Sequence, residues 1–191
     1  MDAKEKQALI KLVGDSLKSI DPYDLETIEA ALKKPISMND SFFLKEKLEV
    51  LSQGDIIKSV PYFGIDSNTQ KGFINFFDSI VLSNTCDCQR KNNIILAPIL
   101  SEGFSEIQKT GNINSKYELF YIPEKEFKTC YIDFSRIFSF PLNILKKRFE
   151  EKKSDRLYSL SFYGFNFFYL KLSVYLFRPE SDEIAPKRDY D

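Results

Sequence analysis

The residues best suited to chemistry lie between two apolar runs, residues 80–82 and 94–100. The candidates for catalysis in this polar connection are Ser83, Cys86, Asp87 and Arg90, and the candidates for binding are Asn84, Thr85, Arg90, Lys91 and Asn92. A thiol, a carboxylate and a guanidinium close together could supply a nucleophile, a base and an anion-binding group. The connection therefore holds most of the chemistry of its segment.

A catalytic role for the cysteines meets two obstacles in the sequence. The chain contains no histidine, so only Arg90 or Lys91 is close enough in sequence to lower the pKa of a thiol at Cys86. Cys86, Cys88 and Cys130 provide fewer thiolates than structural zinc normally takes, and Cys-x-Cys is not its usual spacing. We therefore predict no metal and no cofactor, and keep a redox- or metal-responsive protein as an alternative.

The same connection also has a purely structural interpretation. The side chains of Ser83, Asn84, Thr85 and Asp87 are of the types that bond the backbone where a strand bends. A cysteine is small and apolar enough to fill a core position. On this interpretation the connection supports the fold and performs no reaction.

RNA is an alternative partner for the basic and polar tip, residues 90–93. Proteins bind single-stranded RNA with cations and stacking aromatic rings, and Tyr62, Phe63 and Phe104 lie in expected loops. The formal net charge of the chain is −1, however, whereas proteins that coat nucleic acids carry a basic excess. Any RNA contact would have to be local to the tip.

The composition favours a single well-packed core without covalent staples. The 191 residues include 18 Phe and 10 Tyr, whose rings supply ample apolar area. Three cysteines make no disulfide framework, and the charged N-terminus leads into an amphipathic segment instead of an apolar signal core. No window is apolar for long enough to span a membrane. We expect a cytoplasmic protein with reduced thiols and no membrane contact.

Residues 1–52 are expected to form a helical N-terminal segment. Apolar residues recur at helical spacing over residues 3–20 and over residues 22–35. Asp21 and Pro22 are the residue types found at a helix start. The two patterns predict a pair of amphipathic helices.

A third short helix is predicted over residues 41–51. Its apolar residues Phe42, Leu44 and Leu48 are expected to face inward. The three helices are either a packing subdomain or the module that binds a protein partner.

Strand signals follow the helical segment. A strand over residues 54–58 is expected to end at Pro61, and residues 62–75 are expected to form a polar loop. The two apolar runs around the tip predict a β-hairpin with buried strands. Because no helix separates these middle strands, a small antiparallel barrel is the expected arrangement.

The second half of the chain is expected to alternate loops, strands and helices. Residues 100–115 form a loop, and residues 117–122 and 129–140 form strands. A helix over residues 141–153 carries charges of both signs, as a solvated face does. A helix over residues 162–177 has an aromatic stripe that is either core or a dimer face.

Four short stretches occur in an order that is known from one toxin family. Residues 54–57 read Gly-Asp-Ile-Ile, residues 80–84 read Ile-Val-Leu-Ser-Asn, residues 94–99 read Ile-Ile-Leu-Ala-Pro-Ile, and a late strand follows over residues 130–137. They resemble the "GDI", "VLS" and "-PI-" strands of the MazF/PemK-like toxins. The resemblance covers residues 52–178. It implies an SH3-like barrel, a closing C-terminal helix and a homodimer.

The resemblance does not extend to the residues that give the family its ribonuclease activity. Catalytic members use an arginine just before the "VLS" strand and a threonine directly after "-PI-". The corresponding positions are Phe77 or Asp78 for the arginine and Leu100 for the threonine. None of these side chains can stabilise a pentavalent phosphate as a cation or orient it through a hydroxyl.

The sequence therefore predicts an α+β protein with a helical segment (1–52), a small antiparallel SH3-like β-barrel with C-terminal closing helices (53–179) and a flexible tail (180–191). The predicted function is a non-catalytic interaction module in a bacterial toxin–antitoxin or anti-phage defence setting. Its protein partner is expected to bind the N-terminal helices. The alternative is a divergent endoribonuclease or RNA-binding protein that uses residues 83–93.

Overall fold

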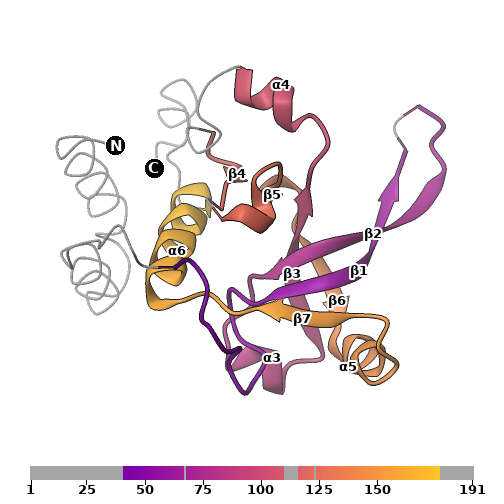
Figure 1. The fold of residues 1–191 in the computed structure, drawn as a ribbon. Coiled ribbons are helices and arrows are strands. Elements are labelled where there is room, and N and C mark those ends of the chain that lie inside the picture. The colour runs from indigo at the N-terminus through magenta and orange to yellow at the C-terminus, as the bar shows by residue number, and fades with distance from the viewer. Residues whose placement is uncertain (1–40, 67, 110–115, 123, 177–191) are drawn as a thin grey trace, which may run out of the picture.

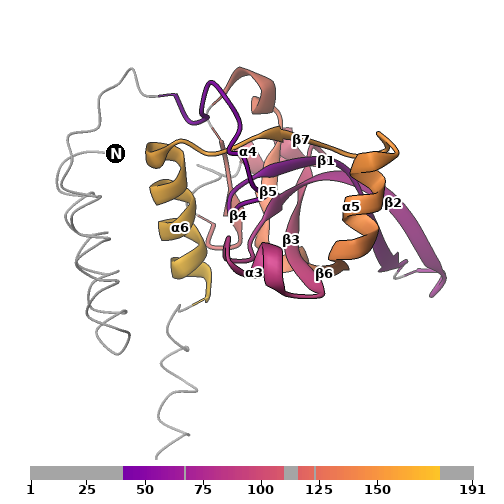
Figure 2. The same cartoon turned by 90° about the horizontal axis from the view of Figure 1, so that it is seen from below.

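A computed structural model describes residues 41–66, 68–109, 116–122 and 124–176 (Figure 1). The predicted helices over residues 3–20 and 22–35 and the predicted tail over residues 180–191 lie outside these ranges. The described part is an α+β fold, as predicted, with an antiparallel sheet between helices (Figure 2).

Seven antiparallel strands form the sheet, in the order β4-β5-β3-β2-β1-β7, and β6 also pairs with β3. Their bounds are β1 Ile56–Ile65, β2 Gly72–Val81, β3 Asn93–Leu100, β4 Leu119–Phe120, β5 Tyr131–Asp133, β6 Phe138–Pro141 and β7 Asp155–Tyr158. The central β3 pairs with β2 along one edge and with β6 and then β5 along the other. The pairings among the described strands leave the sheet open.

Helices cover two sides of this sheet. They are α3 Asp87–Arg90, α4 Phe104–Lys109, α5 Leu142–Glu150 and α6 Phe162–Leu176, with single 3-10 turns at Lys125–Phe127 and Phe134–Arg136. Helices α5 and α6 lie on opposite sides of the body (Figures 1 and 2). Among the described residues, no helix has the length and apolarity to cross a membrane.

The hairpin predicted around the polar connection is confirmed. Ser79, Ile80 and Val81 of β2 pair with Pro98, Ala97 and Leu96 of β3. The side chains of Ile80, Val81, Leu96 and Ala97 are fully buried. The two strands are buried because apolar clusters cover both faces of the sheet, one under α6 and the other under α5.

The prediction that Pro61 ends the first strand is wrong. Strand β1 continues through Pro61, and residues 62–75, predicted as a loop, extend the β1–β2 hairpin to the pair Ile65–Gly72. Pro61 is tolerated because β7 pairs only with Ile56–Lys58, so β1 has one neighbour at that level. The hairpin projects beyond the body (Figure 1).

The predicted helix over residues 41–51 is also wrong. This segment is irregular, with several bends and no helix, and Phe43 forms an antiparallel bridge with Leu160. Phe42 and Phe43 are buried in the cluster under α6, whereas Leu44 and Leu48 are exposed. The helical spacing of the apolar residues was outweighed by adjacent aromatic rings that both enter the core.

Other differences concern short elements. The predicted loop over residues 100–115 contains α4, and the predicted strand over 129–140 is divided by a 3-10 turn into β5 and β6. Helix α5 starts after Pro141 as predicted but ends at Glu150, and α6 occupies most of its predicted range. Strand β7 was not predicted, because Asp155–Tyr158 has only two apolar side chains and its residues are at most half-buried.

Candidate functional site

The polar connection between β2 and β3 folds into turns followed by α3. The amide of Cys86 donates to Asn84 Oδ1 over 3.0 Å, and the amides of Asp87 and Cys88 donate to the Asn84 carbonyl. The side chain of Asn84 therefore starts the turn that leads into the helix. An asparagine at this position has a structural role in the fold.

Ser83 and Thr85 also bond the backbone. The Oγ of the buried Ser83 accepts the amide of Ile95 over 2.8 Å, and Thr85 Oγ1 accepts the amide of Gln53 over 3.2 Å. Ser83 is thus held by the strand it faces and is not presented as a nucleophile. These contacts agree with the structural interpretation of the connection.

The cysteines differ in access and acidity. Cys88 is buried, its thiol donates to the Ser83 carbonyl, and burial, aided by the charges of Asp55 and Asp87, raises its pKa to about 11. Cys130 is half-buried, and burial raises its pKa as well. Cys86 is exposed. Within the described ranges, no His, Cys, Asp or Glu cluster could hold a metal ion.

Five predicted site residues are exposed at this end of the molecule, Asn84 of the first turn among them. Cys86 precedes α3, Arg90 ends it, and Lys91 and Asn92 follow before β3 begins. Asp87 starts the helix and is half-buried. The connection thus offers a small polar and basic surface, but the structure does not combine it with an activated nucleophile.

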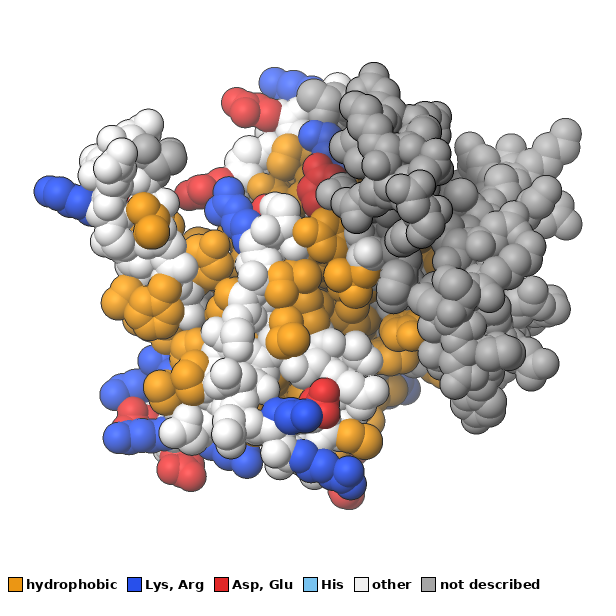
Figure 3. All heavy atoms as spheres, turned by 180° about the vertical axis from the view of Figure 1, so that it is seen from behind, with side chains coloured by type: hydrophobic (Ala, Val, Ile, Leu, Met, Phe, Trp, Pro, Cys, Tyr) orange, Lys and Arg blue, Asp and Glu red, His pale blue; other side chains and the backbone are white. Residues whose placement is uncertain are grey.

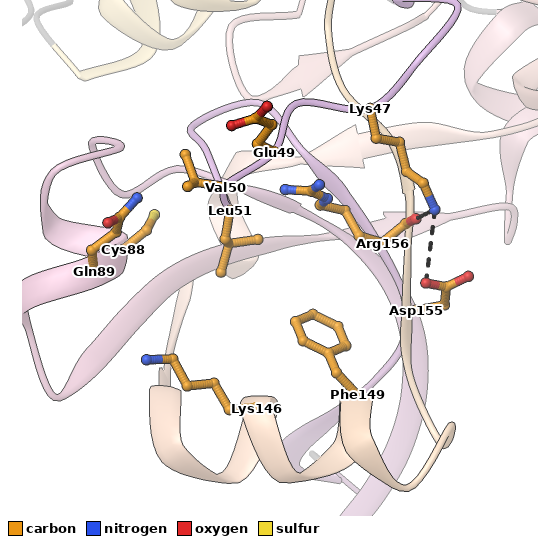
Figure 4. Close-up of a pocket in the computed structure, with 10 residues that line it drawn as sticks. All are labelled: Lys47, Glu49, Val50, Leu51, Cys88, Gln89, Lys146, Phe149, Asp155 and Arg156. Carbon is orange, nitrogen blue, oxygen red and sulfur yellow. Dashed lines mark hydrogen bonds and ion pairs between the residues drawn. The ribbon is translucent and has the colours of Figure 1, made fainter.

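A pocket of about 520 Å³ lies beside this connection (Figure 4). Cys88 and Gln89 of α3 form one wall, and Lys146 and Phe149 of α5 form the floor in the view shown. The remaining walls come from the irregular segment before β1 and from β7, through Lys47, Glu49, Val50, Leu51, Asp155 and Arg156.

Asp55 lies buried next to this pocket. The sequence pattern predicts it only as part of the first strand and not as a site residue. Its Oδ2 accepts the amide of Ser52 over 2.8 Å and lies 3.3 Å from Nη1 of Arg156. Its Oδ1 is buried without a hydrogen-bond partner. Burial raises the pKa of this carboxyl, and the neighbouring Ser159 hydroxyl, the amide of Ser52 and the charge of Arg156 oppose that rise.

Arg156 and Asp55 together hold the segment before β1 against β7. Arg156 Nη2 donates to the carbonyl of Leu48, and Lys47 Nζ donates to the carbonyl of Arg156 over 2.6 Å. Asp55 and Arg156 are 101 residues apart in the sequence, so no local sequence pattern predicts that they form a pair. The only signal was an aspartate placed directly before a strand that is completely apolar at its start.

The charges of the pocket are mostly balanced within it. Asp55 pairs with Arg156, and Asp155 lies 3.9 Å from Lys47. Among the described residues, neither Lys146 nor Glu49 makes an ion pair, so the pocket has one unpaired charge of each sign. Leu51 and Phe149 supply apolar walls. The charges of the lining therefore select neither an anion nor a cation, and the pocket presents no nucleophile next to a base.

The positions that the resemblance assigns to catalysis have structural roles. The half-buried ring of Phe77 packs edge-on to Tyr62, with ring centroids 5.6 Å apart, and Asp78 Oδ1 accepts the amide of Ser59 over 2.9 Å. Leu100 is buried in the cluster with Phe104 and Tyr131. None of the three could take part in phosphoryl chemistry without disturbing the packing.

A comparison with models of known protein families finds no match, and a search among curated proteins finds none either.

Proposed function

We propose that this chain is a non-catalytic protein-interaction module related to the MazF/PemK-like barrels. The observation that carries the proposal is the structural use of Phe77, Asp78 and Leu100 at the positions where catalytic members have their arginine and threonine. A chain that has the motifs in the same order and uses those positions for packing and backbone contacts would use the fold for a purpose other than cleavage.

An SH3-like barrel is the arrangement we propose for the sheet. It is supported by the short antiparallel strands, by the two-sided pairing of β3 and by the position of α6 against the cluster that contains Phe120, Phe134 and Phe168. We further propose a bacterial toxin–antitoxin or anti-phage defence setting and a homodimer, for which the motif resemblance is the support. The protein partner proposed for the N-terminal helices would bind outside the described residues.

A cleavage assay tests the absence of catalysis. Purified full-length chain is incubated with single-stranded RNAs of varied sequence, with Asp87→Ala as the comparison. Intact RNA is the expected result for both proteins. Cleavage that disappears in Asp87→Ala would show the divergent endoribonuclease and end the non-catalytic proposal.

RNA binding without cleavage is the second candidate function. It is favoured by one observation, the exposure of Arg90, Lys91 and Asn92 together at the end of α3. Filter binding of RNA to the wild type and to Arg90→Gln/Lys91→Gln separates it from the first proposal. A redox role would depend on Cys86, because Cys88 is buried.

A further inference from the structure

A groove of about 450 Å³ lies between α5 and the projecting β1–β2 hairpin, away from the pocket beside α3. Pro61 and Phe63 of β1 form one wall, and Ile144 of α5 forms the other, with Phe140 and Pro141 also lining it. The groove is therefore apolar at its centre.

The hairpin extends this apolar surface outward. Pro61 pairs with Phe76, and Phe63 pairs with Ile74, so these four side chains share one face of the hairpin. Phe63 is 64% exposed, Ile74 55% and Phe76 56%, and Ile144 of α5 is 47% exposed. Hydrophobic side chains are visible on the projecting hairpin in Figure 3. Contiguous exposed apolar surface of this kind marks a binding face.

A positioned cation stands beside the apolar surface. Arg148 of α5 donates through Nε to Ser154 Oγ over 2.9 Å and through Nη2 to the Ser59 carbonyl over 2.9 Å, and its guanidinium lies 5.4 Å from the centroid of the Phe76 ring. Among the described residues, Arg148 pairs with no carboxylate. Its Nη2 also donates to the Lys153 carbonyl over 3.2 Å, so Nη1 is the group left to bind a carboxylate, at little entropic cost because the guanidinium is already held in place.

The remaining charges of the groove are also predominantly positive. Lys147 and Lys153 both pair with Glu151, at 3.8 Å and 2.8 Å, and the charge of Arg148 also acts on this carboxylate, so one negative charge faces three positive ones. A second copy of the same face would bring like charges together. The bases of a nucleic acid could stack on the ring of Phe63, but they would not stack on the aliphatic side chains of Ile74 and Ile144.

We propose that this groove binds an acidic amphipathic segment of a partner protein, whose carboxylate pairs with Arg148 while its apolar side chains cover Phe63 and Ile144. The proposal rests on the interaction function proposed above and adds a second contact surface, with its class of partner, to the one proposed for the N-terminal helices. The carboxylate supplies the charge that the groove lacks, and the apolar side chains remove the exposed rings from water.

Binding of a synthetic probe tests the proposal. The probe is a fluorescein-labelled peptide of about 12 residues in which Leu or Phe alternates with Glu, and its counterpart has Lys in place of Glu. Fluorescence anisotropy with full-length protein is expected to show tighter binding of the acidic peptide, weakened by salt. We expect Phe63→Ser/Ile144→Ser to weaken it about tenfold or more.

Ile95→Ser is the matched control, because Ile95 is 44% exposed but lies outside the groove. Amide chemical shifts in the wild type provide a measure that needs no variant, and the acidic peptide should perturb the amides of residues 62–64 and 144–148. Equal binding of the two peptides, or an equal loss in the Ile95→Ser control, would overturn the proposal, as would tighter binding of a single-stranded RNA that depends on Phe63.

Different experimental results would reject the groove as a binding site and reject the proposed function. A native partner whose binding is unchanged by Phe63→Ser/Ile144→Ser would leave the interaction function standing and reject the groove. RNA cleavage by the purified chain would reject the non-catalytic function without bearing on peptide binding.

Discussion

Asp55 is the residue on which the region around the pocket most depends. It is fully buried, bonds Ser52 and faces Arg156, whose side chain is 18% exposed. Removing one member of such a pair leaves the other charge without its partner in a poorly hydrated place. This site is where a single substitution should reveal the largest electrostatic effect on stability.

Asp55→Ala should lower the free energy of unfolding by about 3 kcal/mol, because Arg156 and the amide of Ser52 lose their acceptor. Urea denaturation followed by circular dichroism measures the change. Asp155→Ala is the control, since that carboxylate is 70% exposed and its pair with Lys47 should contribute under about 1 kcal/mol. Similar losses in both variants would contradict the assigned role of Asp55.

Stability should also depend on pH through Asp55. Burial raises its pKa above the ordinary 3.8, so the folded chain retains a proton that the unfolded chain releases. The contribution of Asp55 therefore favours folding at low pH and is lost as pH rises through the folded pKa. Urea midpoints from pH 4 upward should shift in favour of Asp55→Asn relative to wild type. A shift toward wild type would mean that pairing with Arg156 outweighs burial.

The exposed thiol of Cys86 and the buried thiol of Cys88 should react in a fixed order. Iodoacetamide at neutral pH is expected to modify the exposed Cys86 first and Cys88 only on unfolding, because Cys88 is buried with a pKa near 11. Peptide mass spectrometry over a time course gives the order. Rapid modification of Cys88 in the folded protein would show that its wall of the pocket opens.

At the scale of elements, β3 is the strand that joins the two halves of the sheet. Leu96→Ala should cost roughly 2–5 kcal/mol through lost burial and a cavity, because Leu96 is fully buried. The adjacent Ile95→Ala is the control, since that side chain faces solvent on the same strand. Chemical denaturation of both variants measures the difference. A negligible cost at Leu96 would remove β3 from the core.

Residue 164 fixes how closely α6 approaches the segment before β1. A Cβ added at Gly164 would lie 2.2 Å from the carbonyl oxygen of Phe42, a backbone atom that cannot rotate away. Gly164→Ala should therefore cost about 1–3 kcal/mol by overpacking. Gly72→Ala, where the nearest atom is 3.9 Å away, should change stability little. Thermal unfolding of both proteins measures the contrast.

The sequence could predict the elements that depend on local apolar patterns. The apolar runs 80–82 and 94–100 flank a stretch of turn-forming residues, which predicts the β2–β3 hairpin. The long aromatic stripe over residues 162–177 predicts α6. The β1–β2 hairpin was missed because Pro61 is allowed only where a neighbouring strand is absent, and that absence is a tertiary property. The irregular segment with Phe42 and Phe43 was missed because Leu160, its partner, lies far along the chain.

The candidate site shows the same division. The hydrogen-bonding roles of Ser83, Asn84 and Thr85 followed from their residue types, and the structural interpretation of them agrees with the contacts. The pair of Asp55 and Arg156 and the position of Arg148 depend on side chains that only the fold brings together. Long-range electrostatic contacts leave no periodic signal in a sequence.

At the scale of the whole molecule, the body and the projecting hairpin differ in how far their apolar side chains are exposed. The body buries its apolar clusters under α5 and α6, whereas the outer hairpin leaves large side chains in solvent. A chain that exposes Phe63 and Ile65 without a partner would tend to associate nonspecifically. The hairpin is therefore a part of the described structure where a binding partner would remove much exposed apolar surface from water.

The bridge between Phe43 and Leu160 has a consequence for synthesis on the ribosome. Both the bridge and the pairing of β1 with β7 join the beginning of the described body to residues near its end. The β1–β2–β3 hairpins can form as soon as they emerge, because their contacts are local, but one edge of β1 stays unpaired until Asp155–Tyr158 has been translated. The nascent chain must therefore be shielded at this edge until residues 155–158 have been translated, and a premature stop codon before residue 155 would release a protein in which β1 lacks its second neighbour.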